Sequence, residues 1–359
     1  MGERSLDSGR IITYAGAFIA FLIGSGFATG QEVIQYFSSY GYMGILGILV
    51  VFILFLYVGV DFVLAGFNNR FRKGSEVFKY YCGDFVGSLY DYFAVAFIFM
   101  SFVVMIGGAS AAVNQQYGLP GAAGGMAMGV LAGLTVIFGL GRLIDVIGKI
   151  GPLIVVATIL LGISAIVMNP EGLRNASAIP EMDLLRASSN WFLAALSYVG
   201  FCMLWLAGFM ASLGAASSNK RESVWGAALG ALGFSLALAI IALGIMANIE
   251  DLAGSLVPNL LLATGINPHL GTLFSVTVVA GIYTTAVPLL WQVVARFADE
   301  KTARFRLLTV ALAALGVFVG IMVPFDRLVN VIYVVNGYVG VLLLGFMLVK
   351  TVRVAVLER

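Results

Sequence analysis

Long apolar runs, separated by short groups of charged residues, dominate this chain. Uncharged stretches such as 11–31, 33–60 and 223–249 match or exceed the roughly 20 mainly apolar residues that cross a bilayer as a helix. The longer stretch 92–141 divides at 114–121, where polar residues, Pro and Gly stop a helix. Because the runs are continuous rather than alternating, they predict helices and not the strands of a membrane barrel. The pattern predicts ten transmembrane helices, over residues 11–39, 43–66, 86–114, 121–141, 148–168, 190–214, 223–247, 271–297, 304–322 and 327–350.

Composition supports an all-α polytopic membrane protein and excludes several other classes. The 359 residues are 61% hydrophobic and 11% charged, with a mean hydropathy of +1.02, whereas soluble domains average about 25% charged residues. The net charge of +2 provides no field for nucleic acid. One His and two Cys make neither a metal cluster nor a disulfide framework. The sequence contains no phosphate-binding loop and no nucleophile–base pair, so we expect neither an enzyme nor a cofactor, apart from sodium as a coupling ion.

The basic residues predict the orientation of the chain. With the N-terminus inside, all of the 20 Lys and Arg residues except Arg174, Arg186 and Arg327 fall in cytoplasmic segments, as the positive-inside rule requires. The prediction is a multi-pass protein of the plasma (cytoplasmic) membrane with both termini in the cytoplasm. Its expected partners are the lipid bilayer and a small-molecule solute, with no nucleic acid and no obligatory protein partner.

The ten predicted spans divide into two halves. Residues 1–168 contain five spans, residues 169–189 form a polar extracellular connector, and residues 190–359 contain five more spans and a cytoplasmic tail. Because five is odd, the second half lies upside down relative to the first. Such a 5+5 inverted repeat is an architecture of secondary transporters.

The first span of each half carries residues that disfavour a regular helix. In the first, residues 24–30 (GSGFATG) contain three glycines, each of which costs about 1 kcal/mol relative to Ala inside a helix. The corresponding segment of span 6 is 197–201 (SYVGF). We therefore predict that helices 1 and 6 are broken, which exposes main-chain groups that hold anions and cations. The alternative is that these glycines are close-packing contacts between helices.

Three further polar residues lie within apolar surroundings. Thr284 and Thr285 in span 8 offer two hydroxyl oxygens to a hard cation, or else bond the carbonyls of their own helix. Glu32 is an ionisable residue at membrane depth. Such residues are costly in a bilayer, and their presence indicates a functional role. Glu32 would bind a substrate amine or carry a proton; alternatively, it offsets the dipole of the half-helix that follows the break.

The run from Gly24 to Glu32, in a ten-span chain of this length, resembles the YkvI-like membrane proteins of the amino acid–polyamine–organocation (APC) superfamily. That resemblance implies the LeuT-type fold of the neurotransmitter:sodium symporters. It also places sodium ligands at the carbonyls of Ala20 and Ile23, beside Thr284 and Thr285. Ser197 is similar to a serine at the unwound part of span 6. Glu32 has no counterpart that can be carried over from the symporters, and the two extra helices of twelve-span members are absent.

These observations predict a secondary active transporter that works by alternating access, coupled to sodium or protons. Its solute would be small and amino-acid-like, or an amine. The alternative is a non-transporting solute receptor of the spore-germinant-receptor type. The predicted solute site comprises Gly24, Ser25, Gly26, Phe27, Thr29, Glu32, Ser197, Tyr198, Gly200, Phe201 and Tyr283, and the predicted sodium site comprises Ala20, Ile23, Thr284 and Thr285.

Overall fold

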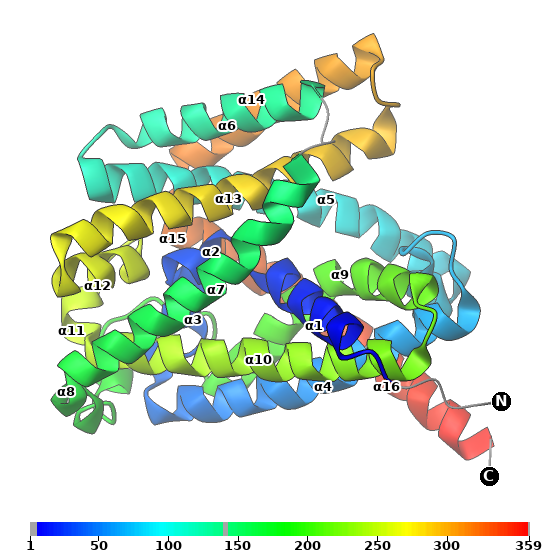
Figure 1. Cartoon of the computed structure of the whole chain (residues 1–359), viewed down its shortest axis with the longest axis horizontal. Coiled ribbons are helices and arrows are strands. Elements are labelled where there is room, and N and C mark those ends of the chain that lie inside the picture. The colour runs from blue at the N-terminus through cyan, green and yellow to red at the C-terminus, as the bar shows by residue number, and fades with distance from the viewer. Residues whose placement is uncertain (1–5, 139–142, 358–359) are drawn as a thin grey trace.

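The computed structural model describes residues 6–138 and 143–357, and within these ranges the chain is helical and contains no strand (Figure 1). Eight helical segments of this part are long and apolar enough to cross a membrane. They are α4 (Tyr42–Asn69), α5 (Glu76–Tyr117), α6 (Gly121–Phe138), α9 (Trp191–Ala216), α10 (Lys220–Ala247), α13 (Pro268–Phe297), α14 (Ala303–Met322) and the segment Phe325–Arg353. The protein is therefore an all-α membrane protein, as predicted.

The last of these segments is not a uniform helix. It begins with α15 (Phe325–Leu328), passes through a π-helical turn, η3 (Val329–Tyr333), and continues as α16 (Val334–Leu357). Single π-helical turns inside longer helices often occur at functional sites.

Two predicted spans correspond to helices that differ from the other eight. The first is α1 (Ser8–Leu22), followed by α2 (Ser25–Thr29), α3 (Gln31–Tyr36) and the short η1 (Ser38–Tyr40). The second is α7 (Leu143–Met168), a 26-residue helix that is not among the eight. The count of ten spans therefore stays a prediction.

Short helices gather at the end of the bundle where α10 ends and α13 begins. The connector forms α8 (Pro170–Arg174) and η2 (Ile179–Glu181), while α11 (Ile249–Leu252) and α12 (Pro258–Ile266) join α10 to α13. Figure 1 shows α8, α11 and α12 together on the side of the bundle away from the end of α16. The opposite end is held by hydrogen bonds from Arg10 to Ser218 and from Arg70 to the Ala215 carbonyl.

The predicted break in helix 6 is wrong. The corresponding helix, α9, is continuous from Trp191 to Ala216. Gly200 is a packing residue, because a Cβ atom there would collide with the carbonyl oxygen of Gly337 in α16. Small residues allow two membrane helices to approach closely, and this alternative explains the glycine of the second half.

Candidate solute and ion site

The first predicted span is interrupted within the glycine-rich run, as the sequence predicts. Helix α1 ends at Leu22, the next two residues are extended, and α2 begins at Ser25. Gly30 then separates α2 from α3 with a φ of 90°, in the left-handed region that glycine adopts without strain. Residues 22–41 are nevertheless all buried. The interruption is therefore an internal feature of the protein and not a loop at its surface.

Side chains from two other helices satisfy the carbonyl groups that the interruption frees. Asn259 of α12 donates its amide to the carbonyls of Phe27 (3.1 Å) and Ala28 (3.2 Å). Thr285 of α13 lies 3.4 Å from the Ile23 carbonyl oxygen. Non-helical backbone inside a membrane protein requires such partners, so α12 and α13 hold the break in place.

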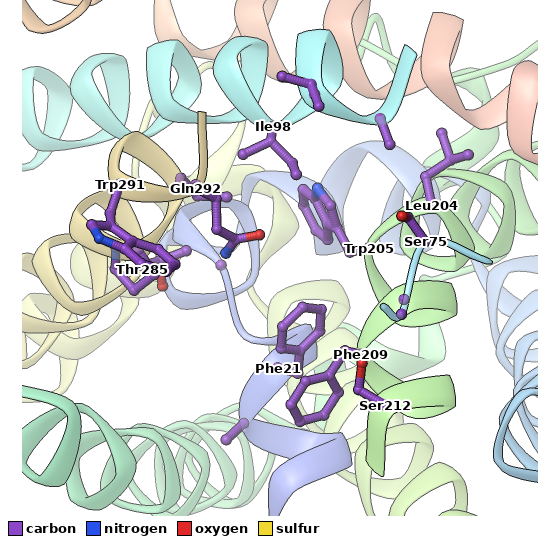
Figure 2. A pocket seen from close by; sticks show the side chains of 18 of the residues that line it. Phe21, Ser75, Ile98, Leu204, Trp205, Phe209, Ser212, Thr285, Trp291 and Gln292 are labelled. Carbon is purple, nitrogen blue, oxygen red and sulfur yellow. The ribbon is translucent and has the colours of Figure 1, made fainter. Parts of the chain in front are cut away.

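A cavity of about 670 Å³ reaches the break from the end of the bundle at which α5 begins and α9 ends. Its inner wall includes Ile23 and Gly24, and its outer part includes the exposed Ser212 and Gln292. Figure 2 shows Thr285, Trp291 and Gln292 of α13 on one side of the cavity and Trp205, Phe209 and Ser212 of α9 on the other. This size and mainly apolar lining, with a few polar groups, suit a small ligand.

Aromatic side chains make up much of the cavity wall. Phe21 of α1 stacks on Phe209 of α9, with ring centroids 4.2 Å apart and an interplanar angle of 6° (Figure 2). Trp205 and Trp291 face the cavity from α9 and α13. The indole nitrogen of Trp205 is buried and has no hydrogen-bond partner in the described chain.

The four residues of the predicted sodium site lie together at the inner end of this cavity. Ala20, Ile23, Thr284 and Thr285 all line it. The Thr284 hydroxyl donates to the Gly281 carbonyl at 2.9 Å, and the Thr285 hydroxyl lies between the carbonyls of Gly281 (3.1 Å) and Ile23 (3.4 Å), with one proton to donate to either. Both hydroxyl oxygens keep lone pairs available to a cation. Within the described residues, no group of three or more His, Cys, Asp or Glu side chains could hold a metal ion.

Glu32 lies behind the break in a cluster of aromatic rings. Its side chain is 1% exposed, and the Tyr198 hydroxyl donates to Oε2 at 3.4 Å. Oε1 has no hydrogen-bond partner in the described chain. The carboxyl group packs so closely on Gly26 that a Cβ atom there would collide with it. Tyr36 and Tyr198 pack edge to face with centroids 5.4 Å apart, and Phe201 stacks on Tyr333 at 4.6 Å.

The remaining predicted solute residues fall into three groups. Ser25 is buried beside Tyr333, within the cluster around Glu32. Phe27 packs on Phe234 of α10, and the Thr29 hydroxyl bonds the Gly26 carbonyl, so both stabilise the break. Ser197 and Gly200 face α16. Tyr283 does not join the others, because its hydroxyl lies 2.7 Å from that of Thr135 in α6.

Several residues near the break were not identified from the sequence. Asn259 was assigned to a loop, although an Asn directly after Pro258 in an apolar segment is a visible signal. Trp205 and Tyr333 lie in apolar runs that predict only a span, so no sequence pattern distinguishes them from lipid-facing aromatic residues.

On the side of the break away from the cavity, polar side chains close the molecule. Gln35 donates to Gln31 Oε1 (2.8 Å) and to the carbonyl of Asp326 (3.0 Å). Asn330 donates to Gln35 Oε1 (3.0 Å), and Gln31 donates to the Ser255 carbonyl (2.6 Å). We call Gln31, Gln35 and Asn330 the glutamine latch. The latch joins α3 to η3 and to the segment before α12.

The chain is similar to known proteins both in sequence and in fold. The chain is 20% identical over 351 residues to the uncharacterized membrane protein YkvI of Bacillus subtilis (strain 168), covering 97% of each chain. Its fold is similar to that of MhsT in complex with L-phenylalanine, with a TM-score of 0.62, 19% identity, and coverage of 95% of this chain and 89% of that one. The chain has the LeuT-type fold.

Two further solved structures are similar to this LeuT-type chain. Mhp1 in its inward-facing conformation gives a TM-score of 0.55 with 15% identity, over 95% of this chain and 77% of that one. A manganese transporter of Eremococcus coleocola gives a TM-score of 0.58 with 14% identity, and the match covers 94% of this chain and 77% of that one. No family model matches the chain. The predicted resemblance to YkvI and to LeuT-type proteins is thus confirmed, and at these identities the solved structures show the fold alone.

Proposed function

We propose that the protein is a secondary active transporter that moves a small amino-acid-like or amine solute by alternating access, coupled to sodium or protons. One observation carries this proposal. The cavity reaches the helix break from one end of the bundle, while the glutamine latch closes the other end. A central site that is open to one side only is the arrangement that alternating access requires.

The proposal includes the ten-span 5+5 inverted repeat. The segment from α1 to η1 and the helix α7 would provide the two spans beyond the eight long helices. Only the first half would contain a broken helix, since α9 is continuous. Asp91 of the cavity lining accepts a hydrogen bond from Arg296, which lies in a segment that the positive-inside rule places in the cytoplasm. The conformation described here would then be open to the cytoplasm.

The character of the cavity supports the proposed class of solute. Extended backbone at Gly24 forms part of the inner wall, where main-chain groups can bond the polar part of a solute. Phe21, Trp205 and Trp291 provide an apolar surface for the rest, and aromatic faces also attract cationic groups. MhsT, which has the same fold, has been solved in complex with L-phenylalanine.

Ligand-dependent thermal stability tests the proposal directly. Purified protein would be heated with individual amino acids and amines, in sodium or potassium and at two pH values. A ligand at 100 times its dissociation constant should add about 2.7 kcal/mol to the unfolding free energy. Trp205→Ala should lose this increment, whereas Trp225→Ala, at an exposed position on α10, should keep it.

Uptake into liposomes then separates a transporter from a receptor. We expect the ligand that stabilises the protein to accumulate in liposomes that contain it. Binding without any uptake or exchange would overturn the transporter proposal and favour the receptor alternative.

A further inference from the structure

We propose that Glu32 carries the coupling proton of this transporter, and that it does not bind the amino group of the solute. The inference rests on the proposed function. It selects one role for Glu32 where the sequence alone leaves three, namely amine binding, proton transfer and compensation of the half-helix dipole. It follows from what surrounds the carboxyl group, from the space beside it, and from the helix on which it stands.

The surroundings of Glu32 contain no positive charge. The titratable groups that face it are Tyr36 on α3, Tyr198 and Cys202 on α9, and Tyr333 on η3. Among the described residues, no Lys, Arg or His pairs with its carboxyl group. A buried carboxylate without a partner is costly, so Glu32 requires a cation or a proton.

Another buried glutamate of the same chain shows the contrast. Glu222, at the start of α10, is 3% exposed. Its Oε1 accepts a hydrogen bond from the Asp7 amide at 3.1 Å, and its Oε2 lies 3.8 Å from Arg10. Glu222 therefore has a cationic partner near its carboxyl group, whereas the described residues give Glu32 only the hydrogen bond from Tyr198.

The space beside Glu32 is too small for an amine. The carboxyl group is in contact with Gly26 on one side and with tightly packed rings on the other. Glu32 does not line the cavity, whose inner wall ends at Gly24. A solute in the cavity is therefore separated from Glu32 by the backbone of the break, and a proton is the cation that fits.

The cluster offers the proton a path from the cavity. Tyr333 packs against Trp205 of the cavity wall, with centroids 5.6 Å apart, and also faces Glu32. The hydroxyls of Ser25, Tyr36 and Tyr333 are buried within the cluster, and Ser25 faces Tyr333. Each hydroxyl can donate to or accept from a transient water. A hydronium ion that arrives by this path gives its proton to Oε1, which forms an O–H bond and leaves a water molecule. Release to water reverses the step.

The position of Glu32 on α3 links this proton to the conformational change. The same six-residue helix carries Gln31 and Gln35 of the glutamine latch. A movement of α3 that breaks the latch therefore also moves Glu32 and opens it to water on the far side. A proton that binds one conformation more tightly than the other shifts the equilibrium between them, and this difference is what couples transport to a proton gradient.

Infrared spectroscopy of the full-length protein tests the proton without any solute. The wild-type spectrum should contain the absorption band of a protonated, buried carboxylic acid. Glu32→Gln should lack this band, and Glu222→Gln should keep it. Glu32→Asp, which restores a carboxyl group, should recover the band and controls for a folding defect in the first variant. A band that persists in Glu32→Gln would overturn the proposal.

Transport in liposomes tests the coupling, with a radiolabelled mixture of L-amino acids as the probe. An inward gradient of about one pH unit supports roughly tenfold accumulation for each proton carried. Glu32→Gln should lose this accumulation and keep exchange of labelled for unlabelled solute, while Glu222→Gln should keep both. If Glu32→Gln still accumulates solute, or if it loses exchange as well as accumulation, the proposed role of Glu32 is overturned.

The wild-type protein tests the transporter function itself. If it neither accumulates nor exchanges the mixture, that function is overturned, and the infrared result would still show whether Glu32 holds a proton.

Discussion

The first segments of the two halves have similar sequences of small and hydroxyl residues but opposite structures. The segment from α1 to α3 is interrupted at Gly24 and Gly30, whereas α9 runs without interruption through Gly200. Glycine permits both outcomes, because it tolerates unusual backbone angles and also allows another backbone to approach. The glycines therefore do not decide which segment is broken.

The neighbouring helices explain the difference. Around the first segment, the side chains of Asn259 and Thr285 are placed to bond the freed carbonyls of Phe27, Ala28 and Ile23. Around Gly200 the neighbour is the backbone of α16 at Gly337, which offers no side chain for this purpose. Unwound backbone in a membrane is tolerated where its polar groups are satisfied, and only the first segment meets that condition. Of these two corresponding segments, the broken one is therefore the one that carries the candidate site.

The largest expected effect is on the unbroken segment. Gly200→Ala places a methyl group against the carbonyl oxygen of Gly337, and neither backbone can move without displacing a helix. We expect the unfolding free energy to fall by about 3 kcal/mol, at the upper end of typical overpacking costs. Thermal unfolding in detergent measures it. Gly345→Ala, on α16 with no atom within 4 Å of the added Cβ, is the control and should leave stability unchanged or slightly raised. Wild-type stability in Gly200→Ala would mean that the close contact of α9 with α16 is not required.

A slightly smaller effect is expected at the broken segment when the predicted cation site is removed. Thr284→Ala combined with Thr285→Ala deletes both hydroxyls beside the Ile23 carbonyl. If sodium binds there, sodium at 100 times its dissociation constant stabilises the wild-type protein by about 2.7 kcal/mol relative to potassium, and the double variant should lose this increment. Thr277→Ala, at a half-buried position on the same helix outside the cavity lining, is the control. A sodium-dependent rise in unfolding temperature that persists in the double variant would exclude this site.

The sequence predicts the helices of the fold well and the site only in part. Apolar runs determine where α4, α5 and α10 lie, because a bilayer leaves no alternative to a helix. The unusual density of glycine in 24–30 predicts the first interruption correctly. The break in α9 was predicted wrongly because its determinant, the backbone of Gly337, is 137 residues away along the chain. Tyr283 was assigned to the solute site by its position in span 8, yet helix rotation turns it towards Thr135.

The smallest expected effect tests whether the break depends on a side chain of a neighbouring helix or on the glycines of the broken segment itself. Asn259→Leu keeps a side chain of similar size and removes the amide that bonds the carbonyls of Phe27 and Ala28. With about 1 kcal/mol for each hydrogen bond, the unfolding free energy should fall by about 2 kcal/mol. Hydrogen exchange should also become faster at the amides of residues 24–30, and much less so in α9. Asn175→Ala in the exposed connector controls for the loss of an Asn elsewhere. If Asn259→Leu leaves both stability and exchange unchanged, the break does not depend on its neighbours, and the contrast between the two segments must arise within the segments themselves.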